Sequence, residues 1–70
     1  MATVVQKFGT KLRKIRKSKK VTQEKLAEKA GIDYSYINSI ERGKRNPTLK
    51  IIAKIARVLG IRLDELMKLK

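Results

Sequence analysis

Apolar residues recur along this chain at intervals of three and four, the spacing that brings them onto one face of an α-helix. The first stretch, which stops at the polar residues 18–20, is marked by Val5, Phe8, Leu12 and Ile15. Its other faces are mostly basic. The same spacing continues over nearly the whole chain, so the pattern predicts helices and an all-α fold.

Capping residues divide the middle of the chain into two short helices. Thr22 offers a hydroxyl to the start of the first, and Gly31 ends it because glycine adopts the left-handed backbone conformation without steric cost. Asp33 caps the second, which we expect over residues 34–42. Residues 22–42 are therefore predicted to be two helices joined by a tight turn.

Two more helices are expected after a basic loop that contains Pro47. The first is capped by Thr48 and ended by Gly60, and its broad apolar side predicts the most buried helix of the domain. That side is expected to consist of Leu49, Ile51, Ile52, Ala53, Ile55, Ala56, Val58 and Leu59. A last short helix, at about residues 62–69, is defined by Leu63, Leu66 and Met67. The prediction is one compact domain of five helices over residues 1–70.

The two helices within residues 22–42 have the features of a helix-turn-helix unit. Ala27 is small where the helices must cross closely, and Ile37 and Ile40 fill the inner side of the second helix. The outward positions are Tyr34, Ser35, Asn38, Ser39 and Arg42. A projecting helix with short polar and amide side chains suits readout of the DNA major groove. Ala27 and Gly31 alone occur in many helical hairpins, so the DNA-binding interpretation depends on their combination with caps, a polar outer side and basic flanks.

The net charge narrows the choice of partners. Nineteen Lys and Arg against six Asp and Glu give a formal charge of +13, which favours a polyanionic partner. The alternatives are a solubilising surface, or the Lys- and Ile-rich composition of a thermophile or an AT-rich genome. No apolar run approaches the roughly 20 residues of a membrane-spanning helix, and residues 1–5 lack the charged lead of a signal peptide. We therefore expect a cytoplasmic, nucleoid-associated protein without membrane contact.

The residue types that usually carry catalysis or metal binding are scarce. The chain has no cysteine and no histidine, which excludes a disulfide framework, a thiolate metal site and the usual general base. No clustered carboxylates remain once the helix caps are assigned. We expect no enzyme activity, cofactor, metal ion or small-molecule ligand, and a fold held by apolar packing to which a partner subunit could add.

A family resemblance extends over nearly the whole chain. The sequence resembles the phage-repressor and Cro type of helix-turn-helix domain, the broad xenobiotic-response-element family, in TQEKLAEKAGIDYSYINSIERGKRNPTLKIIAKIARVLGIRLDEL and the preceding FGTKLRKIRKSKK. Within it, DYSYINSIERGKRN is similar to restriction–modification controller proteins and to short bacterial developmental repressors. The resemblance implies a repressor-like fold and a prokaryotic or phage transcription regulator that binds double-stranded operator DNA.

The resemblance also implies a role for individual residues. Contacts to bases are expected from Tyr34, Ser35, Asn38, Ser39 and Arg45. Contacts to the DNA backbone are expected from Gln23, Tyr36, Arg42, Lys44 and Asn46. Alternatives stay open: Gln23 as a solvated residue at the helix start, Tyr36 as a packed ring, Asn38 as a cap of local backbone groups. Arg45 could contact bases or backbone.

Two positions depart from the family pattern. Tyr34 stands where controller proteins often have Arg after the Asp cap, which argues against a shared operator. Lys20 stands where many relatives have Gly to end the first helix. We therefore expect a slightly strained turn at Lys20.

Arg16 and Glu41 are expected to form a structural ion pair. In similar domains the matching residues join the first helix to the end of the third through a partly buried contact. An unpaired acid beside a DNA-facing helix would repel phosphate, so Glu41 needs a partner. The alternative is an exposed Glu41 that is neutralised by Arg42 or Lys44.

The resemblance implies that the last helix forms a dimer contact, through Leu63, Leu66 and Met67. The alternative for part of this set is that it simply closes the core. A homodimer would present two reading helices about one DNA turn, ~34 Å, apart on a near-palindromic site. Two other functions compete with this interpretation. One is an antitoxin-like or adaptor protein whose main partner is a protein, and the other is a nonspecific nucleoid or RNA-binding protein.

Overall fold

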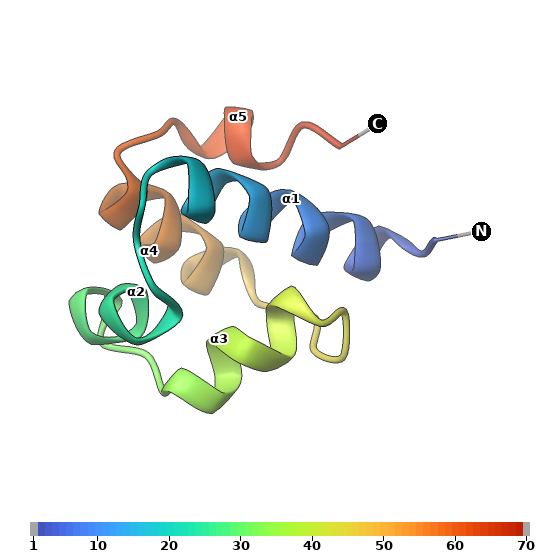
Figure 1. Cartoon of the computed structure of the whole chain (residues 1–70). Coiled ribbons are helices and arrows are strands. Elements are labelled where there is room, and N and C mark those ends of the chain that lie inside the picture. Colours follow the sequence, from blue (N-terminus) through green and yellow to red (C-terminus); the bar gives the residue numbers. More distant parts are fainter. Residues whose placement is uncertain (1, 70) are drawn as a thin grey trace.

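The computed structural model describes residues 2–69 as helices joined by short turns (Figure 1). The helices are α1 (Val4–Ser18), α2 (Gln23–Ala30), α3 (Tyr34–Glu41), α4 (Leu49–Leu59) and α5 (Leu63–Leu66). α1 packs on α3, α2 packs on both α3 and α4, and α5 packs on α4. In Figure 1, α3 lies at the lower edge of the molecule and α5 at the upper edge. The predicted all-α class and its five helices are confirmed.

The expected caps begin and end the central helices. The Thr22 and Thr48 hydroxyls each accept a backbone N–H three residues further on, at 3.0 and 3.2 Å. The Asp33 carboxylate accepts the N–H two residues further on, at 3.0 Å. Gly31 and Gly60 end α2 and α4 in the left-handed conformation, with φ of 66° and 68°. These caps satisfy backbone groups that the helix ends leave without an intrahelical partner.

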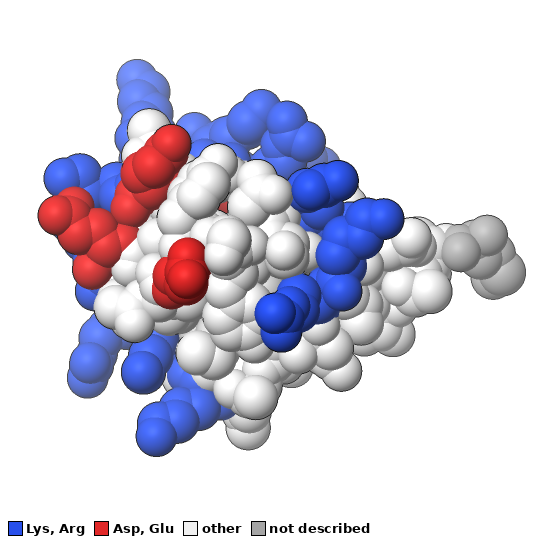
Figure 2. Space-filling view, turned by 90° about the horizontal axis from the view of Figure 1, so that it is seen from below, with Lys and Arg blue, Asp and Glu red and all other residues white. Residues whose placement is uncertain are grey.

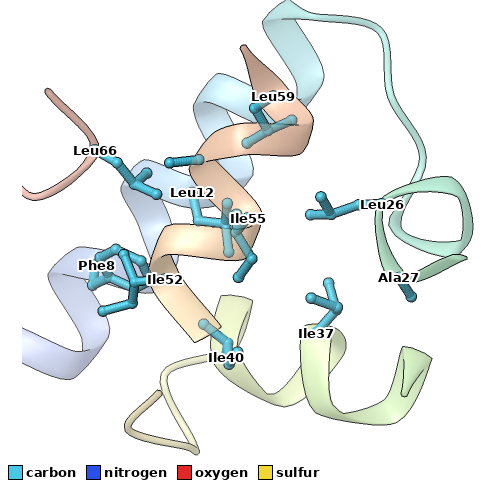
Figure 3. Close-up of a cluster of buried hydrophobic side chains, with 11 residues drawn as sticks. Phe8, Leu12, Leu26, Ala27, Ile37, Ile40, Ile52, Ile55, Leu59 and Leu66 are labelled. Carbon is cyan, nitrogen blue, oxygen red and sulfur yellow. The ribbon is translucent and has the colours of Figure 1, made fainter. Parts of the chain in front are cut away.

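The core gathers side chains from all of the helices (Figure 3). Its buried apolar residues are Phe8, Leu12, Leu26, Ala27, Ile37, Ile40, Ile52, Ile55, Ala56, Leu59 and Leu66. α4 contributes four of them, in keeping with its broad apolar side. Two residues predicted on the buried side of α4, Leu49 and Ala53, are exposed instead. By helical spacing they lie on the flank of the buried side that contains Ile52 and Ile55.

α5 comprises Leu63–Leu66 and is shorter than the predicted helix at residues 62–69. The Nζ of Lys11 donates to the carbonyl of Lys68 at 2.6 Å. This hydrogen bond ties the segment beyond α5 to the side of α1.

No helix within residues 2–69 has the length and apolar character that crossing a membrane requires. Over the same residues, no group of three or more acidic side chains is placed to share one metal ion.

Candidate nucleic-acid interface

α3 has a buried side and a side that is open to solvent. The buried side consists of Ile37, Ile40 and Glu41. Of the predicted outward positions, Tyr34, Ser35 and Arg42 are exposed, and Asn38 and Ser39 are half-buried. The helix therefore stands at the surface and presents a row of polar side chains away from the body.

The turn between α2 and α3 sets the angle at which α3 is presented. Ala27 is buried in α2, which packs on α3. A Cβ at Gly31 would meet no atom within 4 Å, so the turn needs glycine for its left-handed φ and not for space. The Ile32 N–H donates to the Ala27 carbonyl at 2.9 Å and closes the end of α2.

Gly9 positions α3 from the other side, and sequence reasoning did not single it out. It is buried in the middle of α1. A Cβ at Gly9 would collide with the Ile40 carbonyl oxygen and lie 2.8 Å from that of Glu41. α1 therefore approaches the last turn of α3 backbone to backbone. The available signal was a lone glycine inside a helical pattern, which often marks such a close approach.

Arg16 and Glu41 form the expected contact between α1 and α3. The Nε and Nη2 atoms of Arg16 donate to the two carboxylate oxygens of Glu41 at 2.6 and 3.0 Å. Nη1 of Arg16 donates to the Val21 carbonyl at 2.7 Å, which adds the turn before α2 to the contact. The Glu41 side chain is 2% exposed, so the alternative of an exposed acid beside Arg42 or Lys44 is wrong.

Gln23 extends this contact toward the outer side of α3. Its Nε2 donates to Oε1 of Glu41 at 3.0 Å, and its Oε1 accepts the Nδ2 group of Asn38 at 3.1 Å. Gln23 is thus held on both ends of its amide, and not merely solvated at the start of α2. Asn38 bonds to a side chain, and the alternative of a local backbone cap is not what the structure shows.

The loop after α3 carries a second group of polar residues. Lys44, Arg45 and Asn46 are exposed. The Arg45 guanidinium lies over the ring of Tyr36, 5.3 Å from the ring centroid, a cation–π distance. Tyr36 is half-buried and packs against the core, which is the alternative that the sequence left open. The stacking holds Arg45 beside the outer side of α3.

Charge is unevenly distributed on the face that carries α3. Figure 2 looks onto this face: Lys and Arg lie around a largely uncharged area, and the visible Asp and Glu side chains lie in the left half of the view, one of them within that area. An open cleft of about 420 Å³ lies among α1, α2 and α3, and it is lined by Arg13, Arg16, Thr22, Gln23, Glu24, Tyr34, Asn38, Glu41 and Arg42. A polar helix framed by cations offers both hydrogen bonds and phosphate contacts.

Comparison with known proteins assigns the chain to a family. The helix-turn-helix family profile of the Cro/C1 type matches residues 12–66. The chain is a helix-turn-helix protein of this family. Its match contains α2, α3 and α4 entirely, and therefore the whole of the surface described above.

The chain is similar to restriction–modification controller proteins over most of its length. It is 48% identical over 61 residues to the control protein C.MunI of a Mycoplasma species, covering 86% of this chain and 82% of that protein. It superposes on the controller protein C.AhdI of Aeromonas hydrophila with a TM-score of 0.86 and 45% identity, covering 89% and 94% of the two chains. The biofilm regulator SinR, solved in complex with DNA, has a TM-score of 0.82 and 35% identity over 87% and 98%.

Lys20 carries the strain expected from its departure from the family pattern. Its φ is 59°. Among the described residues 2–69, Lys20 alone has a positive φ without being glycine. A side chain with a Cβ is disfavoured in this conformation. This helix-turn-helix protein therefore forms the turn after α1 with a strained backbone at Lys20.

The three residues matched to a dimer contact in the family do not share one environment. Leu66 is fully buried in the core, so its predicted place in a dimer contact is wrong. Leu63 and Met67 are 38% and 42% exposed. Leu66 points into the domain because α5 packs on α4, which leaves its two neighbours on the outside.

Proposed function

We propose that this protein is a transcription regulator that binds double-stranded DNA by placing α3 in the major groove of an operator. The observation that carries the proposal is the row of polar side chains on the exposed side of α3, framed by Lys and Arg. A helix with its side chains is about 10–12 Å wide, and the major groove is about 12 Å wide. The DNA complex of SinR and the similarity to controller proteins support the same function.

Base selection is assigned to the residues on α3 and to one arginine beside it: Tyr34, Ser35, Asn38, Ser39 and Arg45. Backbone contacts are assigned to Gln23, Tyr36, Arg42, Lys44 and Asn46. For Arg45 the stacking on Tyr36 supports a base contact, because it places a guanidinium next to the reading helix. The protein needs no catalytic group for this function, which depends on occupying the operator.

A homodimer on a near-palindromic operator is part of the proposal. Leu63 and Met67 are large apolar side chains left partly exposed on and after α5, and the exposed Val4 at the start of α1 lines the same hollow as Met67. An exposed apolar surface of this kind is typical of a subunit contact. Two copies joined by a two-fold axis would read two half-sites about one DNA turn apart.

Selection of binding sites from random duplex DNA at physiological salt tests the proposal. The expected result is a two-fold related motif with affinity well above that for random sequence. A protein that binds all duplexes alike, with only a steep salt dependence, would instead be a nonspecific nucleic-acid binder. Purification together with a second protein and no DNA selection would favour the adaptor function.

A further inference from the structure

We infer that Gln23 determines base specificity without contacting a base, by fixing which end of the Asn38 amide faces the DNA. The inference rests on the proposed function, since it concerns how α3 reads an operator. It gives Gln23 a role that differs from the phosphate contact assigned above. The contacts that carry it run from the buried Glu41 through Gln23 to Asn38.

We call the two hydrogen bonds that join Glu41 to Gln23 and Gln23 to Asn38 the relay. Hydrogen-bond chemistry determines which atom donates and which accepts in each of them. A carboxylate only accepts hydrogen bonds, and both oxygens of Glu41 already face the guanidinium of Arg16. The atom of Gln23 that meets Glu41 must therefore be the amide nitrogen, at 3.0 Å. The other end of the Gln23 amide is then its oxygen, which only accepts. The atom of Asn38 that meets it at 3.1 Å must be the nitrogen.

The relay determines what Asn38 offers to a base. Its Oδ1 and the second proton of its Nδ2 remain free for a partner, since one Nδ2 proton is used by Gln23. An acceptor beside a donor is the pattern that pairs with N6 and N7 of adenine in the major groove. An amide without the relay can turn over and exchange its oxygen and nitrogen at little cost, and it then tolerates other bases.

Burial makes the relay a firm reference for the amide. Glu41 is held in place by Arg16, and the two side chains are 2% and 9% exposed. Gln23 and Asn38 are both half-buried, one at the start of α2 and the other in the middle of α3. The buried position of Glu41 thus fixes the orientation of the Asn38 amide through two hydrogen bonds.

Replacement of Gln23 by Met tests the inference, because Met keeps an unbranched side chain of similar length but has no donor or acceptor for the relay. Site selection is repeated with Gln23→Met and with wild type. One bidentate contact discriminates among bases by roughly 5-fold to 150-fold. We expect the wild-type preference at one base pair of each half-site to fall to less than about 3-fold in Gln23→Met, with the other positions unchanged.

Asn38→Ala provides the matched control. The loss of preference should occur at the same base pair in Asn38→Ala, and adding Gln23→Met to that variant should change the preference no further. A uniform loss of affinity in Gln23→Met, with every base preference kept, would overturn the inference and leave Gln23 as a phosphate contact. Gln23→Ala serves as a second variant if Gln23→Met does not fold.

The free protein offers a test that needs no operator. Nuclear magnetic resonance should show one Asn38 Nδ2 proton exchanging slowly with solvent in wild type and rapidly in Gln23→Met. Equal exchange in both proteins would overturn the relay. Failure of wild type to select any DNA sequence would instead overturn the proposed function, while the exchange measurement would still decide whether the relay exists.

Discussion

The guanidinium of Arg16 and the carboxylate of Glu41 are joined by two hydrogen bonds that connect the last turn of α1 to the last residue of α3. Charge-assisted bidentate pairs of this kind are stronger and more directional than single hydrogen bonds. Because the outer side of the same helix carries the polar row, this pair helps to set the rotation at which α3 meets its partner. It also removes one acid from the surface beside the DNA.

Replacement of Glu41 by Ala should destabilise the fold by about 3–5 kcal/mol, because it leaves the Arg16 charge buried without a partner. The free energy of unfolding in urea measures this change. Base preference in site selection should relax only at the base pair read by Asn38, because Glu41 anchors the hydrogen bonds through Gln23 to Asn38, and the other preferences should stay.

Glu28→Ala is the matched control for Glu41→Ala. Glu28 lies in α2 and pairs with Lys25 at 3.4 Å, but both side chains are more than half exposed. Exposed ion pairs of this kind contribute about 0–1 kcal/mol. Equal destabilisation by the two substitutions would contradict the structural role of the buried pair.

Lys20→Gly should stabilise the protein. Relief of the left-handed φ of 59° gains about 1–2 kcal/mol. The greater freedom of glycine in the unfolded chain takes back about 0.4–1 kcal/mol. The net gain should be roughly 0.5–1 kcal/mol, visible as a rise of a few degrees in the midpoint of thermal unfolding. A lower midpoint would show that Lys20 makes a compensating contact.

Local chemistry made the starts of α2, α3 and α4 predictable from the sequence. Thr22, Asp33 and Thr48 are capping residues next to apolar periodicity, and a hydrogen bond within three residues needs no knowledge of the rest of the fold. The ion pair of Arg16 and Glu41 was reached by another route, through a family resemblance, since their separation of 25 residues has no local signature.

Contacts between distant segments account for most of what the sequence did not predict. Leu66 was matched to a dimer contact through the family resemblance, with closure of the core left open, because the sequence does not tell which side of α5 meets α4; Leu66 closes the core. The capping box of Thr3 and Gln6 at the start of α1 was overlooked, although it is local. The hydrogen bond from Asn38 to Gln23 depends on the angle between α2 and α3, which apolar spacing leaves undetermined.

Gly9→Ala should destabilise the protein although alanine is the better helix former. Helix propensity alone predicts a gain of about 1 kcal/mol. The new Cβ would meet backbone carbonyl oxygens of α3, which cannot move aside as a flexible side chain would. Overpacking of this kind costs about 1–3 kcal/mol or more, so the steric effect should prevail. A calorimetric midpoint above that of wild type would contradict the close approach of α1 and α3.

Lys44→Ala should weaken DNA binding almost equally for all sequences. If Lys44 contacts one phosphate, the slope of log affinity against log salt should become shallower by about 0.9 per subunit. Lys54→Ala removes the same charge from an exposed position on α4 and should leave the slope nearly unchanged. Equal changes in both variants would show that net charge, and not a contact from the loop after α3, determines the affinity.

Met67→Glu and Leu66→Ala should separate dimer formation from folding. Met67 is 42% exposed, so a glutamate there leaves the fold intact but places a charge in the proposed subunit contact. Sedimentation should then show a monomer, with reduced affinity for a two-fold related site. Leu66 is fully buried, so Leu66→Ala should destabilise the protein by about 2–5 kcal/mol. A Met67→Glu protein that keeps the wild-type mass and affinity would place the dimer contact elsewhere, while one that unfolds would show that Met67 belongs to the core.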